Sequence, residues 1–357
     1  MGEREHPELA SASIIQLGTS RIIYQMMDRL TKSTEWEAIL KRNQWYQNQM
    51  LKKVTSVIND LEPGIFFSYS YTALELAQFL KNRGWKIVIG QIDPGKLEED
   101  LVADEEASCP EFESFQKRAP SEYWNTWKSE MVVADAIMVN SQWSKDALLK
   151  QGISEHKIKV VPLAYTDQTN IKTNRNYPKA FDKQRPLRVL FLGQINIRKG
   201  VHILLDALES LKGFPIEVDF VGPNYLSIPE KYKHLPVSFH GAVPRSVAEQ
   251  FYADADIFIL PTLSDGFAIT QLEALSKALP LMISKNCAEL VKHKENGYQL
   301  EHVNALEIKK ALEFCVNNPG AISQWSKNSQ VPSNCSLDHL GERLQEIEFS
   351  LIEKGAS

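Results

Sequence analysis

The sequence lacks the cysteine pattern of a metal site or a disulfide framework. Its four cysteines, Cys109, Cys287, Cys315 and Cys335, lie far apart, with no CxxC pair and no histidine at metal-ligand spacing. We therefore expect all four to be reduced and to take no part in the chemistry. No apolar run approaches the ~20 residues that span a bilayer, and residues 1–7 lack the apolar core of a signal peptide. These absences predict a cytoplasmic protein.

An excess of positive charge is also absent. Lys and Arg total 40 against 45 Asp and Glu, which gives a formal net charge of −5. Nothing therefore draws the whole protein onto a polyanion, and we do not expect nucleic acid as a partner. Apolar residues make up 43% of the 357 residues, enough to bury a core, and this length favours two domains.

Short apolar runs alternate with amphipathic stretches from residue 65 onward, which predicts strands that alternate with helices. The expected strands lie at 64–69, 85–91, 135–140, 157–163, 187–193, 216–222, 237–241, 256–261 and 280–284. Continuous apolar strands of this kind indicate parallel sheets covered on both faces, so we expect an α/β protein with two Rossmann-like domains. No GxGxxG follows any of these strands, which removes the main support for a hydride-transfer enzyme.

A polar, aperiodic stretch at 166–185 separates the two halves. We place an amino-terminal domain at 1–180, a carboxyl-terminal domain at 181–335 and a terminal segment at 336–357 that contains a helix from Leu337 to Glu353. Residues 20–61 carry apolar positions at helical spacing, which predicts a helix-rich start.

Two adjacent cations, Arg198 and Lys199, directly precede an expected helix. Positive charge is unfavourable there, because the helix dipole already places about half a positive charge at the amino terminus. The arrangement is explained if an anion such as a phosphate binds between the cations and the free N–H groups. The alternative is that both side chains are exposed and solvated.

A second anion cradle is expected where the strand at 256–261 passes through a glycine turn into a helix. Glu273 lies in the first turn of that helix, within reach of ligand hydroxyls, and Asp265 stands on the preceding loop. Two alternatives stay open. Thr270 and Glu273 have the letters of a capping box, in which Glu273 bonds only its own helix, and Asp265-Gly266 can be a simple turn.

Together these motifs resemble the family 4 glycosyltransferases of the GT-B fold, which move a sugar from a nucleotide donor. The family signature is a pair of acidic residues eight positions apart with Gly-Phe after the first, matched here by Asp265-Gly266-Phe267 and Glu273. Further matching segments, which extend the resemblance over residues 65–320, are 134–141, 160–163, 191–193, 199–200 and 255–261.

The resemblance implies two Rossmann-like domains that face across a cleft, a terminal helix that packs back towards the amino-terminal domain, and transfer with retention of configuration. It implies that Glu273 binds the donor ribose, that Asp265 contacts the transferred sugar and that Lys199 neutralises the leaving group. The donor diphosphate is held by the backbone of Gly266, Phe267, Ala268, Ile269 and Thr270. The nucleotide sugar is then a substrate, and we expect neither a metal nor another cofactor.

The chain departs from the family pattern at several positions. Gln194 stands where Arg is usual, so we expect Arg198 to bind the phosphate instead. Asp265 replaces the usual Glu. Ile92-Asp93 stands where His-Asp is frequent, and we expect Asp93 near the reacting sugar, with a turn residue as the alternative. Asp254-Ala255-Asp256 has the letters of the metal-binding DxD motif, but it joins a helix to a strand and is interpreted as structural.

The helix-rich start departs most from the family, so the acceptor stays unidentified: a glycan, a lipid-linked molecule or a small molecule. For this segment two interpretations stay open, namely contact with a partner or with lipid at the inner membrane face, and packing of an ordinary helix face on the sheet. The residues concerned are Trp36, Lys41, Arg42, Trp45, Tyr46, Met50, Lys52 and Lys53. The alternative function is a non-catalytic nucleotide-sugar-binding or scaffold protein on the same fold, which the departures at Gln194 and Asp265 suggest.

Overall fold

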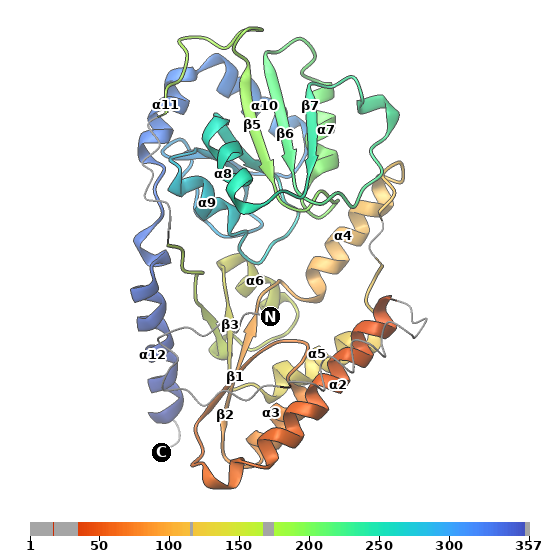
Figure 1. Ribbon diagram of the computed structural model, residues 1–357, viewed down its shortest axis with the longest axis vertical. Coiled ribbons are helices and arrows are strands. Elements are labelled where there is room, and N and C mark those ends of the chain that lie inside the picture. Colours follow the sequence, from red (N-terminus) through yellow and green to blue (C-terminus); the bar gives the residue numbers. More distant parts are fainter. Residues whose placement is uncertain (1–16, 18–34, 115–116, 167–174, 354–357) are drawn as a thin grey trace. The chain divides into compact units, whose positions relative to one another are not determined.

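The computed structural model describes residue 17 and residues 35–114, 117–166 and 175–353 (Figure 1). The chain divides into two compact units. We call them the small unit, Met1–Ile89 with Ala119–Asp135, and the large unit, Gly90–Arg118 with Ala136–Ser357.

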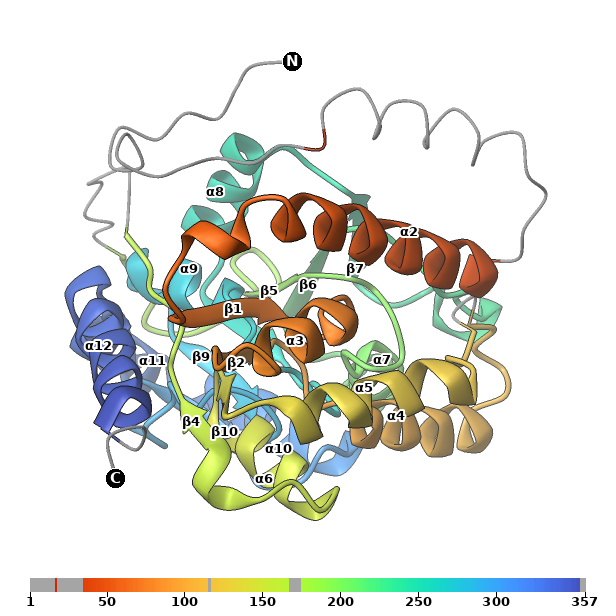
Figure 2. The same ribbon diagram turned by 90° about the horizontal axis from the view of Figure 1, so that it is seen from below.

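The described part of the small unit contains three α-helices. They are α2 (Glu35–Thr55), α3 (Leu74–Lys81) and α5 (Ser121–Val133), and α3 packs against both of the others (Figure 2). Acidic residues in the first turn of α2 and lysines in its last turn complement the helix dipole, and the helix contains neither glycine nor proline. The predicted helical start is thus confirmed from residue 35 onward, and its earlier part, residues 20–34, lies outside the described residues.

A four-stranded sheet has the order β1 (Ile65–Tyr69), β2 (Lys86–Gln91), β3 (Ala136–Val139) and β4 (Ile158–Val160). Strands β3 and β4 pair in parallel. The turn η2 (Ile58–Asp60) precedes β1, and α4 (Lys96–Ser108), α6 (Gln142–Lys150) and η3 (Glu155–Lys157) lie between the later strands in the sequence.

The large unit contains a six-stranded sheet whose paired strands all run parallel. Its order is β10 (Gly297–Leu300), β9 (Leu281–Ser284), β8 (Ile257–Leu260), β5 (Leu187–Leu192), β6 (Ile216–Val221) and β7 (Val237–Gly241). The predicted parallel α/β architecture is therefore confirmed, and β10 was not predicted. The order reverses between β5 and β8, and ligands of such sheets bind at this switch point, beyond the carboxyl ends of the strands.

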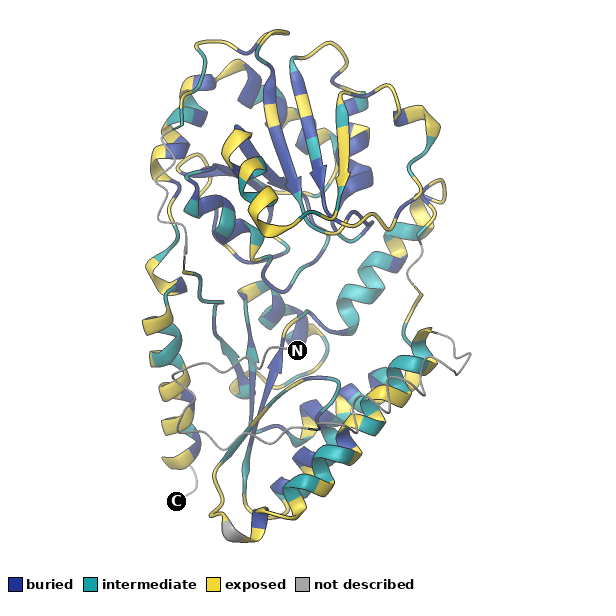
Figure 3. Cartoon of the chain, in the orientation of Figure 1, coloured by how far each residue is buried: buried dark blue, intermediate teal, exposed yellow. Residues whose placement is uncertain are grey.

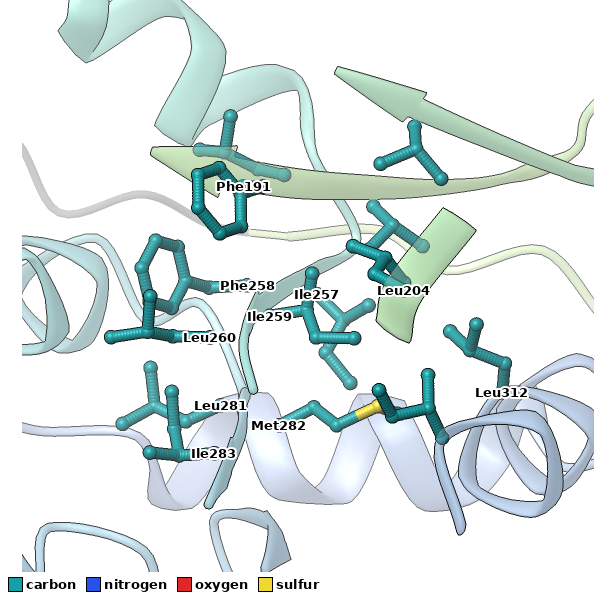
Figure 4. Packing of buried hydrophobic residues seen from close by; sticks show 14 of the residues in the cluster. Phe191, Leu204, Ile257, Phe258, Ile259, Leu260, Leu281, Met282, Ile283 and Leu312 are labelled. Carbon is teal, nitrogen blue, oxygen red and sulfur yellow. The ribbon is translucent and has the colours of Figure 1, made fainter. Parts of the chain in front are cut away.

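Helices α7 (Val201–Glu209), α8 (Arg245–Asp254), α9 (Thr270–Ser276), α10 (Ala305–Asn317) and α11 (Pro319–Asn328) belong to the same unit, with the turns η4 (Glu230–Tyr232) and η5 (Ser333–Cys335). Every residue of β8 and β9 is buried. In Figure 3, the strands β5 and β6 of the same sheet are also coloured mostly as buried. Figure 4 shows Phe191, Phe258 and Leu260 from the strands, and Leu204 of α7 and Leu312 of α10, within one core. Each such side chain contributes about 1.5–3 kcal/mol on burial, which explains why these strands read as unbroken apolar runs.

The terminal helix α12 begins at Leu337 and ends at Glu353, as the sequence predicts. Its Arg343 donates a hydrogen bond to the Val160 carbonyl of β4 at 3.3 Å. Among the described residues, no helix combines the length and apolar character that crossing a membrane requires.

Two further predictions are confirmed in the large unit. Asp256 of the Asp254-Ala255-Asp256 motif is structural, because both of its oxygens accept hydrogen bonds from Arg185 at 2.6 Å. One of those oxygens also accepts the Arg188 N–H at 2.9 Å. The four cysteines are all unpaired and buried, so none forms a disulfide.

Candidate functional site

The loops that follow β5 and β8 meet at the switch point of the six-stranded sheet. Leu263 N–H donates to the Arg198 carbonyl at 2.8 Å, and the buried Thr262 hydroxyl donates to the same oxygen at 3.0 Å. Gly200 has a left-handed backbone with φ of 71°, and a Cβ there would lie 2.0 Å from the Pro261 carbonyl oxygen. Only glycine permits this approach, so Gly200 allows the two loops to pack closely against each other.

Asp265 holds both predicted cations. Its Oδ2 accepts hydrogen bonds from Lys199 Nζ and from Arg198 Nη1, the latter at 3.1 Å. Its Oδ1 accepts the Phe267 N–H at 3.0 Å, and Arg198 also donates to the Ser264 carbonyl at 3.1 Å. Lys199 is only 7% exposed. The alternative in which Arg198 and Lys199 are solvated surface residues is therefore wrong.

The charges of this cluster act strongly on Asp265. Burial opposes its ionisation, but the positive charges of Lys199 and Arg198 outweigh burial and lower the pKa of the carboxyl to about 2. Asp265 is thus ionised at neutral pH. The same two interactions hold both cations at the carboxyl ends of β5 and β8.

A third carboxyl group, Glu98 on α4, faces the cluster and was not predicted. Its Oε1 lies 3.6 Å from Arg198 Nη1, and its side chain is 17% exposed. Its Oε2 is buried and has no hydrogen-bond partner among the described residues. Burial raises the pKa of Glu98 to about 7; the Arg198 charge lowers it, while Asp93 and Asp265 raise it further.

Asp93 forms the turn that was considered as the alternative to a functional role. Its Oδ1 accepts the Gly95 N–H at 2.8 Å and the Gln91 side-chain amide at 2.7 Å. The turn nevertheless lies beside the site, since a Cβ at Gly266 would be 1.9 Å from the Ile92 carbonyl oxygen. Gly266 is therefore required for close packing of these two segments.

Glu273 lies in the first turn of α9, as predicted, but it does not form a capping box. The helix has no side-chain cap at its amino terminus. Glu273 Oε2 instead accepts a hydrogen bond from the Tyr252 hydroxyl of α8 at 2.7 Å. Tyr252 was not predicted. Burial, followed by the charge of Glu273, raises its pKa well above the usual range, so it stays a donor to Glu273.

The segment between Asp265 and α9 carries the remaining predicted residues. Phe267 is buried, whereas Ile269 is 44% exposed. Ala268 has a left-handed backbone with φ of 61°, unusual for a residue with a Cβ. Gln194, in the loop after β5, is exposed and accepts the Asn196 amide at 3.3 Å. In the described part of the chain, no cluster of three or more His, Cys, Asp or Glu side chains is arranged to hold a metal ion.

Comparison with known proteins places this site in a family context. Residues 186–318 match the family described as glycosyl transferases group 1. An uncharacterized glycosyltransferase of Haemophilus influenzae is 34% identical over 96 residues, which cover 26% of this chain and 27% of that protein. The chain spans between about a quarter and about half of the length of the first curated relatives it matches.

Two solved structures share the fold. Sucrose-phosphate synthase from Thermosynechococcus elongatus has a TM-score of 0.66 at 17% identity, over 91% of this chain and 81% of that one. Anabaena Alr3699/HepE in complex with UDP-glucose has a TM-score of 0.60 at 18% identity, over 85% and 82%. The chain therefore has the GT-B fold, and its residues 186–318 carry a glycosyl transferases group 1 domain.

Proposed function

We propose that the protein is a glycosyltransferase, of the family 4 type, which moves a sugar from a nucleoside-diphosphate donor to an acceptor with retention of configuration. The observation that carries this proposal is the pair Arg198 and Lys199, held by Asp265 at the switch point of the parallel sheet. Two fixed cations at that place suit the charge that develops on a departing diphosphate. The neighbour with bound UDP-glucose supports the same class of donor.

Each remaining residue of the site has a role in this proposal. Glu273, oriented by Tyr252, accepts hydrogen bonds from the ribose hydroxyls. The backbone from Gly266 to Thr270 donates to the diphosphate. Lys199 and Arg198 neutralise the leaving group, and Arg198 replaces the phosphate contact that Gln194 does not make. Asp93 and Asp265 face the transferred sugar, and a donor phosphate oxygen takes the acceptor proton.

The charge balance limits when the donor binds. Arg198 and Lys199 carry two positive charges, Asp265 cancels one, and an ionised Glu98 cancels the other. Because buried like charges repel, a diphosphate binds most tightly when Glu98 is protonated. Glu98 therefore sets the pH range of donor binding in this proposal.

The test begins with a thermal-shift screen against UDP, GDP, ADP and their sugar nucleotides. A ligand at a hundredfold excess over its Kd stabilises the protein by about 2.7 kcal/mol, so a true donor is readily detected. Donor hydrolysis and transfer are then measured, with Lys199→Ala as the inactive control and with EDTA present, since the proposed chemistry uses no metal. Tight binding without hydrolysis or transfer favours the non-catalytic binding protein, and loss of activity in EDTA contradicts the metal-independent mechanism.

A further inference from the structure

The small unit contains a cavity of about 560 Å³ whose lining includes residues of α2, α3 and α5. Pockets for small ligands fall in the range of about 300–1,000 Å³. The cavity is lined by Glu37, Leu40, Lys41, Asn43, Gln44, Trp45, Gln47, Asn48, Tyr71, Glu75, Glu122, Tyr123 and Thr126. None of these residues belongs to the candidate donor site.

Aromatic rings form one part of the lining. Tyr71 and Tyr123 stack with ring centroids 4.8 Å apart and an interplanar angle of 11°. Trp36 meets Tyr123 edge-on at 5.0 Å. Tyr123 is thus held by rings from two other segments, and Trp45 adds a further ring to the lining.

The backbone of Tyr71 is held in an unfavourable conformation to make that stack. Its φ is 75°, a left-handed value that costs a residue with a Cβ roughly 1–2 kcal/mol. The fully buried Glu130 carboxylate accepts the Tyr71 N–H at 2.6 Å and the Ala73 N–H at 2.8 Å, and Asn43 donates to the Tyr71 carbonyl at 3.3 Å. Strain that the surroundings enforce in this way is characteristic of ligand sites.

The rest of the lining is polar but carries little positive charge. Among the described residues of the lining, four side-chain amides come from α2, and three carboxylates stand with one lysine, Lys41, which gives these residues a formal charge of −2. Such a surface repels phosphates and offers both donors and acceptors to hydroxyl groups. The Glu75 carboxylate has one buried oxygen, Oε2, with no hydrogen-bond partner among the described residues. An acceptor that is buried without a partner is costly, so the Glu75 side chain lines the cavity at a cost in stability.

We propose that this cavity binds an uncharged sugar ring. The apolar face of the ring packs on the tyrosine and tryptophan rings, and its hydroxyls bond the amides of α2 and the Glu75 carboxylate. An apolar ligand would leave the side-chain amides of the lining without hydrogen bonds, and an anionic ligand would be repelled by its carboxylates. The binding itself is independent of the proposed transfer reaction; only its use as the acceptor site rests on that function.

Saturation-transfer NMR tests the proposal on the full chain with neutral methyl glycosides of glucose, galactose, mannose and N-acetylglucosamine, alongside glucose 6-phosphate. We expect at least one neutral glycoside to bind and the phosphorylated sugar to bind more weakly than methyl glucoside. Tyr123→Ala should lower the affinity about tenfold or more. Tyr46→Ala is the matched control, because Tyr46 is 40% exposed on α2 and does not line the cavity, and it should leave the affinity unchanged.

Glu75→Leu separates a ligand-binding role from a structural one. Removal of an unpartnered buried carboxylate oxygen should raise the thermal unfolding midpoint, while the loss of an acceptor should weaken glycoside binding. These opposite signs also decide the matter if Tyr123→Ala does not fold. The proposal is overturned if no neutral glycoside binds, if the phosphorylated sugar binds better, or if Glu75→Leu leaves affinity unchanged.

The same samples distinguish this proposal from the proposed function. Lys199→Ala should lose UDP-glucose affinity and keep glycoside binding, whereas Tyr123→Ala should do the reverse. Glycoside binding by a protein that binds no sugar nucleotide would leave this inference intact and refute the transferase.

Discussion

Lys199 and Asp265 form an ion pair that joins the loop after β5 to the loop after β8. The lysine side chain is 9% exposed and the aspartate side chain 13% exposed, so the pair is largely shielded from water. Because Asp265 also binds Arg198, one carboxylate places two cations at the switch point. The cluster is thus assembled before any ligand enters, which lowers the cost of ordering charge around a diphosphate.

We expect Asp265→Asn to destabilise the protein by about 3 kcal/mol, because it leaves two shielded cations without their counter-ion. Urea unfolding measures the change. Asp254→Asn is the control, since Asp254 is exposed and bonds only Gln250 among the described residues. A loss no larger than that of the control would contradict a central role for the pair.

The pH dependence of stability also tests the role of Asp265. The folded pKa of Asp265 is about 2, below its ordinary value of 3.8. Asp265 therefore contributes stability above its ordinary pKa, and this contribution is lost as the pH falls from about 4 to about 2. Asp265→Asn should remove that part of the acid dependence.

We expect UDP-glucose affinity to fall as the pH rises through about 7, the pKa of Glu98. Above that pH the carboxylate is charged and competes with the diphosphate for Arg198. Glu98→Gln should bind more tightly at about pH 8 and show a flatter pH profile. Asp104→Asn, an exposed charge change on the same helix α4, should keep the wild-type profile. Affinity that is independent of pH in the wild type would refute this role.

The ionisation of Glu98 changes the pH dependence of stability in the direction opposite to that of Asp265, because the pKa of Glu98 is raised and the pKa of Asp265 is lowered. The folded pKa of Glu98 is raised above its ordinary value of 4.5, so its contribution to stability is complete below about 4.5 and is lost as the pH rises to about 7. Glu98→Gln should therefore make the free energy of unfolding depend less on pH in this window, as measured by denaturant titration.

We expect Glu273→Gln to weaken UDP binding roughly tenfold, because a charge-assisted hydrogen bond contributes about 1.5–3 kcal/mol. Tyr252→Phe should have a smaller effect, since it removes only the group that orients Glu273. Calorimetry with pyrophosphate is the control: it has no ribose, so both variants should bind it like the wild type. Equal UDP affinity in Glu273→Gln and wild type would remove the ribose role.

Glu273 and Glu98 differ in whether the sequence could predict them as site residues. Glu273 was predicted because strand, glycine turn, helix and acidic residue follow one another within one local motif. Its partner Tyr252 lies 21 residues before Glu273 in the sequence. Glu98 lies about 100 residues before Arg198, the cation that it faces. Such contacts depend on how loops and helices pack, which residue spacing does not encode.

The same limit applies to the fold. The strands β5, β8 and β9 were predicted because they are buried and read as apolar runs. The strand β10 has the sequence GYQL, with two partly exposed residues, and such a short mixed segment gives no periodic signal. The cavity of the small unit could not be predicted from the sequence either, because its lining includes Tyr71, whose left-handed backbone conformation gives no sequence signal.

The phosphate contact is the most consequential prediction, since Gln194 occupies the place where an arginine is expected. Arg198 contacts the Asp265 and Glu98 carboxyl groups and donates a hydrogen bond to the Ser264 carbonyl. These contacts position its charge in the site. Arg198→Ala and Lys199→Ala should each lower UDP-glucose affinity about tenfold or more and slow transfer.

Gln194→Arg should then change little, because Gln194 is exposed and its carbonyl oxygen bonds Asn196 rather than the ion cluster. Lys212→Ala, which removes an exposed lysine of the same unit, is the control for net charge. Affinities are measured by calorimetry at fixed ionic strength, with unfolding curves for each variant. If both alanine variants bind like the wild type while Gln194→Arg binds more tightly, Arg198 is not the phosphate ligand, and the non-catalytic binding protein becomes the better description.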